Sequence, residues 1–268
     1  MNSEKKKPPP EEYGIDRLFT LKDKVSLVTG GSGGLGSAIA SALAGCGSTV
    51  VISARNIEKL KKVKDQTEAS GRKVSIHRMD VLNAKEVEKE MESVYQEYGR
   101  IDILVNAHGI NRRIPTPEYP LKTWEEIVDT NLKGTFITCK AVAKYMIRQK
   151  LGKIINISST AAASGYAWGY SAYSPSKAGV DSLTRTLAVE WGKYGITVNS
   201  IAPYFVYTEL TQKFLSDPSM SRKLVRDVPL GRLGYPRDVV GAVVFFAAPA
   251  SDWVSGQVLY VDGGYMAH

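Results

Sequence analysis

Tyr173 and Lys177 are four residues apart in a segment expected to be helical, so their side chains would lie on one face of the helix. Pro175 would fall in the first turn, where its missing N–H leaves no hydrogen bond unmade. An ordinary phenol, with a pKa of about 10, is a weak proton donor or acceptor near neutrality. A nearby ammonium stabilises the phenolate and lowers that pKa. The pair could therefore exchange a proton with a small molecule, although this spacing alone is common on helices.

Three other polar residues could take part in such chemistry. Ser158 and Ser159 follow the apolar segment 153–157, which is expected to be a strand. A hydroxyl at the carboxyl end of a strand could donate to a substrate oxygen, or it could cap the next element. Asn131 stands inside the expected helical segment 123–149, where its side chain competes for backbone hydrogen bonds. It therefore indicates a kink or a binding site within that segment.

The segment 29–36 is rich in glycine and follows the apolar strand candidate 25–28. Glycine allows positive φ and a close approach of a ligand to the backbone. The N-terminus of the next helix presents free N–H groups and a positive dipole end to phosphates. Alone, a glycine-rich stretch could equally be a structural turn, but the order strand, turn, helix in a βαβ unit favours a dinucleotide site.

The residues 53–56, at the end of the second strand candidate, contain Arg55 and no acid. An acidic side chain there would bind the ribose 2′-hydroxyl of NAD, whereas a basic one accommodates the 2′-phosphate of NADP. NADP is therefore favoured. NAD is the alternative, because Arg55 could be a surface residue and the turn 29–36 adds no second basic side chain.

Short β-rich runs alternate with helix-length amphipathic segments from residue 23 onward, and most runs are continuously apolar, as in strands covered on both faces. Asn83 with Glu86, and Thr123 with Glu126, fit capping boxes at helix starts. The pattern predicts a single α/β domain with a Rossmann-type, doubly wound parallel sheet of seven strands and helices on both faces. Ligands of such a sheet bind beyond the carboxyl ends of its strands. The predicted strands are 25–28, 49–53, 74–77, 101–106, 153–157, 197–201 and 258–261.

The formal net charge is +8, but the basic residues are spread along expected helices, as in 59–64, which is typical of solvated helix faces. We therefore expect no nucleic-acid partner, although a basic protein attracts anionic cofactors and substrates. Residues 1–17 are expected to be a disordered tail before a folded domain over 18–268. No apolar run fits a signal peptide or membrane span. With Cys46 and Cys139 as the only cysteines, we expect no metal site and a cytoplasmic protein.

Taken together, these residues resemble the short-chain dehydrogenase/reductase family over residue 18 to about 265. Each motif is weak alone, but the ordered set at this spacing is specific. The motifs are 29–36, Asp80 with Val81, 106–109, Asn131, Ser159, Tyr173 with Lys177, Pro203 and Thr208.

The resemblance implies an NAD(P)-dependent enzyme that moves a hydride between nicotinamide and the carbonyl or alcohol carbon of a small substrate. It implies that Tyr173 is the general acid or base, and that Lys177 lowers its pKa and binds the nicotinamide ribose. It further implies that Ser159, rather than Ser158, bonds the reacting oxygen, and that Asn131 holds a water of a proton relay. The cofactor-binding residues that it implies are Gly30, Ser32, Gly33, Gly34, Leu35, Gly36, Arg55, Asp80, Val81, Asn106, Tyr173, Lys177, Pro203, Val206 and Thr208.

Two positions depart from the family pattern. Tyr204 follows Pro203 where glycine is usual, so the loop either takes a different backbone path or places a ring beside the nicotinamide. His108 replaces a small residue. We interpret it as a packing variant rather than a catalyst, because Tyr173 already supplies the proton.

The local sequences 109–113 and 228–234 resemble those of gluconate 5-dehydrogenases and related sugar-acid dehydrogenases. An arginine just beyond a strand could hold a substrate carboxylate through two parallel hydrogen bonds. Arg113 is preferred to Arg112 for this role, and a surface or subunit-contact role is the alternative. A reductase of 3-oxoacyl thioesters or other neutral ketones is a second hypothesis, and a non-catalytic NADP-binding sensor a third. The resemblance also implies a homotetramer.

Overall fold

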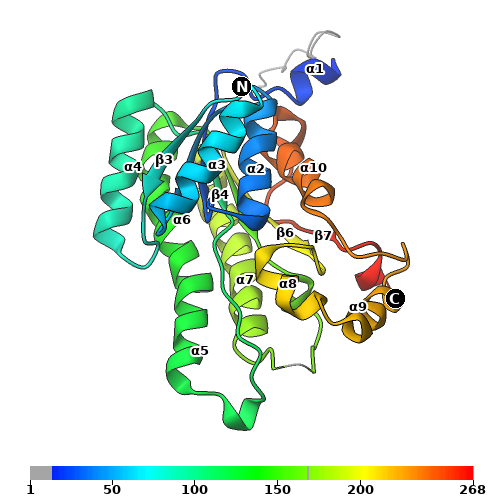
Figure 1. Cartoon of the computed structure of the whole chain (residues 1–268). Helices are drawn as coiled ribbons and strands as arrows, with labels where there is room; N and C mark the ends of the chain where they lie inside the picture. Colours follow the sequence, from blue (N-terminus) through cyan, green and yellow to red (C-terminus); the bar gives the residue numbers. More distant parts are fainter. Residues whose placement is uncertain (1–13, 168, 268) are drawn as a thin grey trace, which may run out of the picture.

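The computed structural model describes residues 14–167 and 169–267, and its centre is a seven-stranded, wholly parallel sheet (Figure 1). The strand order is β3-β2-β1-β4-β5-β6-β7, so the chain reverses direction across the sheet between β3 and β4. This confirms the predicted doubly wound sheet. The strands are β1 Val25–Thr29, β2 Thr49–Ala54, β3 Val74–Arg78, β4 Ile103–Asn106, β5 Gly152–Ile157, β6 Ile196–Pro203 and β7 Val258–Val261.

Helices cover both faces of the sheet (Figure 1). On one face α4, α6 and α7 form the first core cluster, and on the other α2, α3 and α10 form the second. The helices are α1 Ile15–Leu18, α2 Gly34–Gly45, α3 Ile57–Ala69, α4 Ala84–Tyr98, α5 Leu121–Val128, α6 Gly134–Gln149, α7 Tyr173–Trp191, α8 Glu209–Leu215, α9 Pro218–Arg226 and α10 Pro236–Ala247.

The apolar runs reflect burial on both faces of the sheet. Neighbouring side chains on a strand point to opposite faces, and Leu27 and Val28 on β1 accordingly belong to different core clusters, with exposures of 1% and 0%. Because helices remove both faces from water, a polar residue at either position would be costly. The observed strands therefore lack the alternating pattern of a half-exposed sheet.

One predicted helix start and the predicted tail differ from the structure. Asn83 caps α4 as predicted, with its side chain accepting from the backbone N–H of Glu86 at 3.2 Å. The cap predicted at Thr123 is wrong, because α5 already begins at Leu121 after Pro120. The range 1–17 predicted as disordered includes Ile15, which starts the single turn α1, whereas residues 1–13 lie outside the described residues. Pro120 is the N-cap residue of α5, which has no side-chain cap, and Thr123 falls inside the first turn of the helix.

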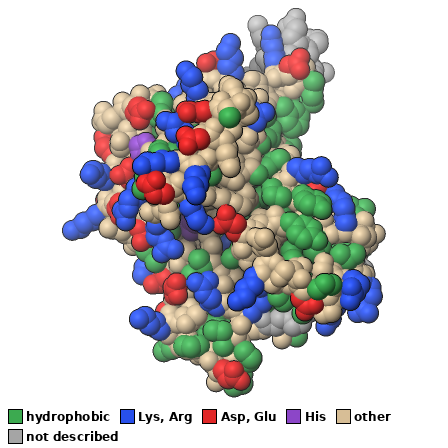
Figure 2. Space-filling view, viewed as in Figure 1, with side chains coloured by type: hydrophobic (Ala, Val, Ile, Leu, Met, Phe, Trp, Pro, Cys, Tyr) green, Lys and Arg blue, Asp and Glu red, His purple; other side chains and the backbone are tan. Residues whose placement is uncertain are grey.

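Charged side chains of both signs are mixed over the surface of α3 and α4 (Figure 2). On α3, Lys61 pairs with Glu58 at 2.9 Å and Lys64 with Glu68 at 3.8 Å. Such i,i+3 and i,i+4 pairs are characteristic of solvated helices and fit the interpretation of segment 59–64. None of the helices in the described part of the chain is long and apolar enough to cross a membrane.

Candidate active site

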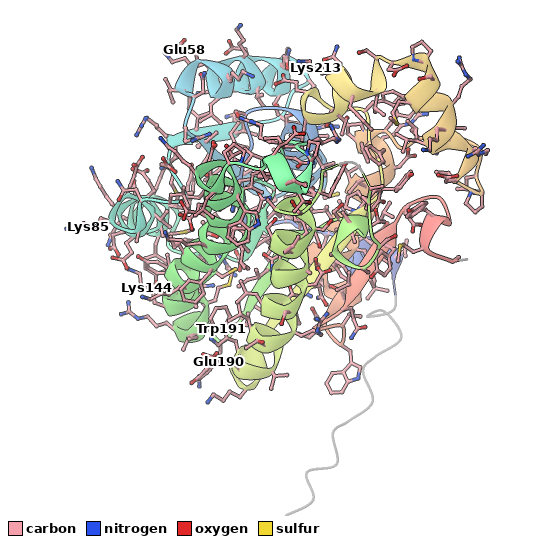
Figure 3. The ribbon with its side chains drawn as sticks, turned by 90° about the horizontal axis from the view of Figure 1, so that it is seen from below. Glu58, Lys85, Lys144, Glu190, Trp191 and Lys213 are labelled. Carbon is pink, nitrogen blue, oxygen red and sulfur yellow. The ribbon has the colours of Figure 1, made fainter. Side chains whose placement is uncertain are left out.

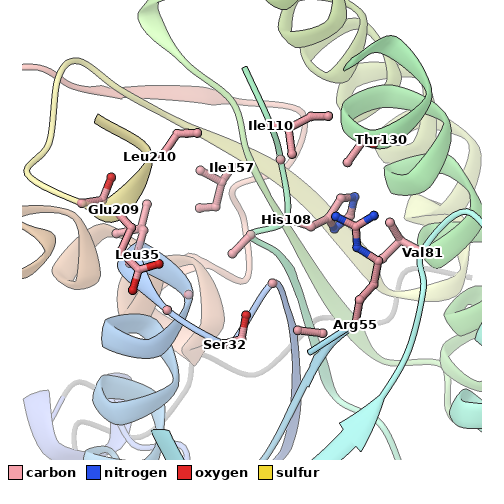
Figure 4. A pocket seen from close by; sticks show the side chains of 18 of the residues that line it. Ser32, Leu35, Arg55, Val81, His108, Ile110, Thr130, Ile157, Glu209 and Leu210 are labelled. Carbon is pink, nitrogen blue, oxygen red and sulfur yellow. The ribbon is translucent and has the colours of Figure 1, made fainter. Parts of the chain in front are cut away.

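A cleft of about 660 Å³ opens at the carboxyl ends of the strands, where a doubly wound sheet binds its ligands (Figure 4). Its walls come from the segments that follow β1 to β6 and from the starts of α7 and α8. Three predicted residues, Asn106, Arg113 and Asn131, are outside this lining. Those that line it are Gly30, Ser32, Gly33, Gly34, Leu35, Gly36, Arg55, Asp80, Val81, Arg112, Ser159, Tyr173, Lys177, Pro203, Val206 and Thr208.

The glycine-rich turn has the geometry of a phosphate cradle. A Cβ on Gly30 would lie 2.7 Å from backbone atoms of His108, and a Cβ on Gly36 would overlap the carbonyl oxygen of Gly30. Gly34 has φ of +56°, which favours glycine. Gly33 caps α2 without a side-chain hydrogen bond, so the first N–H groups of α2 are left for a ligand. The turn therefore fits the pyrophosphate of a dinucleotide.

Tyr173 and Lys177 lie in the first turns of α7, as predicted, and both line the cleft. The Lys177 Nζ donates to the carbonyl oxygen of Ile157 at 2.7 Å and lies 5.8 Å from the centroid of the Tyr173 ring. Burial lowers the pKa of Lys177 to about 8, and Asp181 opposes this shift. The ammonium is therefore still largely charged at neutral pH.

The pKa of Tyr173 moves opposite to the expected direction. Burial raises it to about 12, with a further rise from Tyr170, while a hydrogen bond from Ser159 and the charge of Arg113 lower it. Burial therefore destabilises the phenolate by more free energy than the neighbouring groups contribute to its stabilisation. The proton of Tyr173 is held firmly by the protein alone, so any additional stabilisation of the phenolate has to come from Lys177 and bound ligands.

The two serines after β5 have different surroundings. Ser158 is 3% exposed, and its Oγ donates to the carbonyl oxygen of Lys177 at 3.4 Å. The Ser159 side chain lowers the pKa of Tyr173, and its Oγ accepts from the Ala161 N–H at 3.2 Å. Ser159 is therefore the serine whose hydroxyl stands beside the phenol.

Asn131 lies in the π-helical turn Asp129–Lys133 between α5 and α6, an irregular turn within the segment where a kink or a binding site was predicted. Its Oδ1 accepts from the Ile110 N–H at 2.8 Å, and its Nδ2 donates to the Ile110 carbonyl at 3.0 Å and to Ser176 Oγ at 3.0 Å. A Cβ on Gly109 would lie 3.2 Å from Asn131 Oδ1 and 3.5 Å from Lys177 Nζ. The glycine thus lets the amide and the ammonium approach each other.

Asn106 was predicted to bind the cofactor, and the structure places its side chain outside the cleft lining. Its side chain is 2% exposed and lies in the core beneath the cleft. The Nδ2 donates to Asn156 Oδ1 at 2.9 Å, and the Oδ1 accepts from Thr138 Oγ1 at 2.8 Å. With both ends of the amide bonded to other elements, the Asn106 side chain holds the end of β4 in place.

The two departures from the family pattern have structural explanations. His108 is buried between Thr29, whose Oγ1 lies 2.6 Å from Nδ1, and Thr135, whose Oγ1 lies 3.4 Å from Nε2. Burial lowers the pKa of His108 to about 3, so the ring is neutral near pH 7 and cannot act as an acid there. Tyr204 keeps negative φ and stacks on Tyr265 at 4.1 Å, so it adds a ring to the wall without backbone strain.

Arg113 and Arg112 face different parts of the site. Arg113 lines a smaller hollow that shares Ser159 and Tyr173 with the cleft. Its Nε and Nη2 each donate to Tyr170 Oη at 3.1 Å, and its guanidinium lies 3.9 Å from the Phe214 ring centroid. Arg112 is exposed and lines the cleft instead, with Nη1 donating to the Asn111 carbonyl at 3.0 Å.

Several residues of the site were not predicted from the sequence. Lys59 and Glu209 face each other across the cleft, 150 positions apart, and no spacing pattern joins them. An aromatic wall surrounds the smaller hollow, drawn from three separate segments. Its members are Tyr166, Tyr170, Tyr204, Phe205, Phe214 and Tyr265. Among the residues that the structure describes, no group of three or more His, Cys, Asp or Glu side chains could hold a metal.

Comparison with known proteins gives a consistent family. A family model described as "Enoyl-(Acyl carrier protein) reductase" matches residues 30–266. The gluconate 5-dehydrogenase of Gluconobacter oxydans is 38% identical over 92% of this chain and 96% of its own length. A 3-oxoacyl-[acyl-carrier-protein] reductase of Synechocystis is 39% identical over 92% of this chain and 98% of its own. The structure of a gluconate 5-dehydrogenase from Burkholderia cenocepacia, in complex with NADP and tartrate, superposes with a TM-score of 0.91. The two chains are 34% identical, and the match covers 95% of this chain and 100% of the other chain.

Proposed function

The chain belongs to the short-chain dehydrogenase/reductase family, and from that premise we propose that it transfers a hydride between NADP and a secondary alcohol or ketone carbon of a sugar acid, such as gluconate or 5-ketogluconate. Membership of the family makes it an oxidoreductase of alcohol and ketone groups. The choice of an acid as the substrate rests on one observation. Arg113 stands in a wall that also contains Ser159 and Tyr173.

Arg113 is suited to hold a carboxylate because it is already fixed. Its Nε and Nη2 are bonded to Tyr170, and Phe214 supports one face of the guanidinium. Two of its five N–H groups are thereby used, and Nη1 makes no hydrogen bond with the residues that the structure describes, so that side of the guanidinium can serve a ligand. A side chain held in this way loses little conformational entropy on binding. A carboxylate anchored there would present a more distant hydroxyl of the same molecule to Ser159 and Tyr173.

The cleft fits NADP through its glycine turn and Arg55. When bound, the nicotinamide supplies or accepts the hydride. The N–H groups at the start of α2 would hold the pyrophosphate, and Arg55 the 2′-phosphate. Two relatives with this fold, each called a gluconate 5-dehydrogenase, have been solved with NADP, at TM-scores of 0.91 and 0.89. NAD is the alternative cofactor.

The remaining residues would move the proton. Ser159 and Tyr173 would both bond the reacting oxygen, and Tyr173 would accept the hydroxyl proton in oxidation or donate it in reduction. The charge on Lys177 favours the phenolate form. Asn131 would hold the π-helical turn and the water that connects Lys177 with solvent. Each of these roles is a proposal for this chain.

The first test is a substrate panel followed by nicotinamide absorbance. NADP⁺ and NAD⁺ are offered separately with gluconate, other sugar acids and the matching neutral polyols. The proposal expects turnover of acids, much slower turnover of polyols, and a preference for NADP⁺. Equal turnover of acids and polyols would refute the sugar-acid assignment, while the enzyme class would stand.

A second candidate substrate is a 3-oxoacyl thioester. It is favoured by the Synechocystis relative and by the aromatic wall around Arg113, which also offers apolar contact. With such a substrate, activity would not depend on a free carboxylate and would run mainly toward reduction with NADPH. Acetoacetyl thioesters therefore belong in the same panel. A non-catalytic NADP-binding sensor is a remote third alternative, and turnover of any of these substrates would dismiss it.

We also propose a homotetramer in the cytoplasm, as the resemblance implies. Large apolar side chains are exposed on α6, α7 and β7, including Phe136 at 47%, Val189 at 85% and Leu259 at 38%. Sedimentation velocity on the purified protein would test this, with a tetramer expected near four times the 29.3 kDa of one chain.

A further inference from the structure

An ion pair between α3 and α8 lies at the cleft. The Lys59 Nζ on α3 lies 2.9 Å from Glu209 Oε2 on α8, and both residues line the cleft. Figure 3 shows α3 and α8 side by side, with Glu58 and Lys213 labelled on them. The pair is largely exposed, with side chains 52% and 67% accessible, so it contributes little to the stability of the fold. Its position at the cleft therefore points to a role in binding.

The carboxylate of Glu209 lies against the glycine turn. Its Oε1 is 3.4 Å from the point that a Cβ on Gly33 would occupy. Gly33 caps α2, so the positive end of that helix dipole faces the same point. In Figure 4, Glu209 lies on the side of the cleft toward Leu35. A negative charge of the protein thus stands where the phosphates of a dinucleotide would be held.

Lys59 belongs to the wall that carries Arg55. It lies in the first turn of α3, where the Asn56 side chain accepts from the Lys59 N–H at 3.0 Å. Within the described residues, the Arg55 guanidinium makes no hydrogen bond or ion pair with protein, whereas the Lys59 ammonium is bonded to Glu209. Lys59 thus lies one helical turn after Arg55, and both residues line the cleft.

We propose that Lys59 is a second cation for the 2′-phosphate of NADP, and that Glu209 limits both the affinity and the selectivity for this cofactor. Glu209 competes with the 2′-phosphate for Lys59 and repels the pyrophosphate. The phosphate group, with a charge near −2, attracts the ammonium more strongly than one carboxylate does. This inference rests on the NADP use proposed above.

The test measures binding directly, by calorimetric titration of NADP⁺ and NAD⁺ into the purified protein. The variants are Lys59→Gln, Glu209→Gln and the double variant. Lys61→Gln is the matched control, because Lys61 is on the same helix and is paired with Glu58 at 2.9 Å but does not line the cleft. A parallel titration with 2′,5′-ADP and 5′-AMP isolates the contribution of the 2′-phosphate.

Lys59→Gln should weaken NADP⁺ and 2′,5′-ADP about tenfold, as expected for one lost charge-assisted contact, and leave NAD⁺ and 5′-AMP within twofold. Glu209→Gln should tighten NADP⁺ about fivefold and NAD⁺ about twofold, because only the pyrophosphate repulsion affects NAD⁺. In the double variant, the extra gain in affinity for NADP⁺ over NAD⁺ that Glu209→Gln produces should disappear. Lys61→Gln should bind as the wild type does.

Two results would overturn the inference. One is an unchanged affinity of Lys59→Gln for NADP⁺ while the wild type prefers NADP⁺. The preference would then come from Arg55, and the proposed cofactor would stand. The other is a Glu209→Gln variant that binds neither NADP⁺ nor NAD⁺ more tightly than the wild type does. A wild type without preference for NADP⁺ would instead contradict the proposed cofactor itself, and this inference with it.

Discussion

Replacing Arg113 by leucine tests the substrate assignment most directly. With Nε and Nη2 bonded to Tyr170, the Nη1 side of the guanidinium remains to form charge-assisted hydrogen bonds with a carboxylate. Each such bond contributes about 1.5–3 kcal/mol, and partial exposure of Arg113 favours the lower end for two bonds. A loss of about 3 kcal/mol lowers kcat/KM for a sugar acid a little more than a hundredfold.

The assay compares kcat/KM for one sugar acid with that for its neutral polyol. Arg113→Leu should lose about a hundredfold on the acid and less than about threefold on the polyol, since the polyol has no carboxylate to lose. Arg113→Lys keeps the charge without the fork and should be intermediate. Arg112→Leu is the matched control, because Arg112 is exposed and lines the cleft rather than the smaller hollow.

Thermal melting of each variant checks that the fold is intact, since Arg113 also packs on Phe214. That contact contributes about 1 kcal/mol, which the fold should tolerate. The reasoning is refuted if Arg113→Leu, still folded, loses equally on acid and polyol. It is also refuted if Arg112→Leu shows the larger loss on the acid.

Three further predictions concern Tyr173, Lys177 and His108. Tyr173→Phe should lower turnover at least about a thousandfold with cofactor affinity unchanged in titration, and near-normal turnover would dismiss Tyr173 as the proton donor. Because the pKa of Lys177 is lowered to about 8, its ammonium loses its charge and the reduction rate should fall as pH rises through that value. A pH–rate profile whose falling limb is unchanged in Lys177→Arg would contradict this. Because the pKa of His108 is lowered from 6.5 to about 3, the unfolded chain binds the proton first, and stability is lost as pH falls from about 6.5 toward 3. At about 1.4 kcal/mol per pH unit, the free energy of unfolding measured in urea should be about 3 kcal/mol lower at pH 4. His108→Asn should make the free energy of unfolding less dependent on pH. An equal dependence in both proteins would argue against a buried neutral ring.

Much of the fold could be predicted because its signals are local. The seven strands are apolar runs, since both faces of a parallel sheet are buried, and each predicted run became a strand. The glycines of the turn are required by contacts that admit no Cβ, as at Gly36. Asn131, whose side chain bonds backbone groups of another segment, lies in a π-helical turn, where the sequence had indicated a kink or a binding site. The spacing of Tyr173 and Lys177 likewise follows from the periodicity of one helix.

What the sequence could not determine depends on groups that are distant along the chain. Asn106 points into the core because Thr138 and Asn156, on other elements, bond its amide. The pKa of Tyr173 is raised mainly by burial in the folded protein, which outweighs the lowering effects of Ser159 and Arg113. Arg112 and Arg113 are adjacent in sequence, yet Arg112 lines the larger cleft and Arg113 the smaller hollow, a difference that arises only in the folded loop. Hydrogen bonds within one element are encoded by residue spacing, whereas desolvation and contacts between elements exist only once the chain is folded.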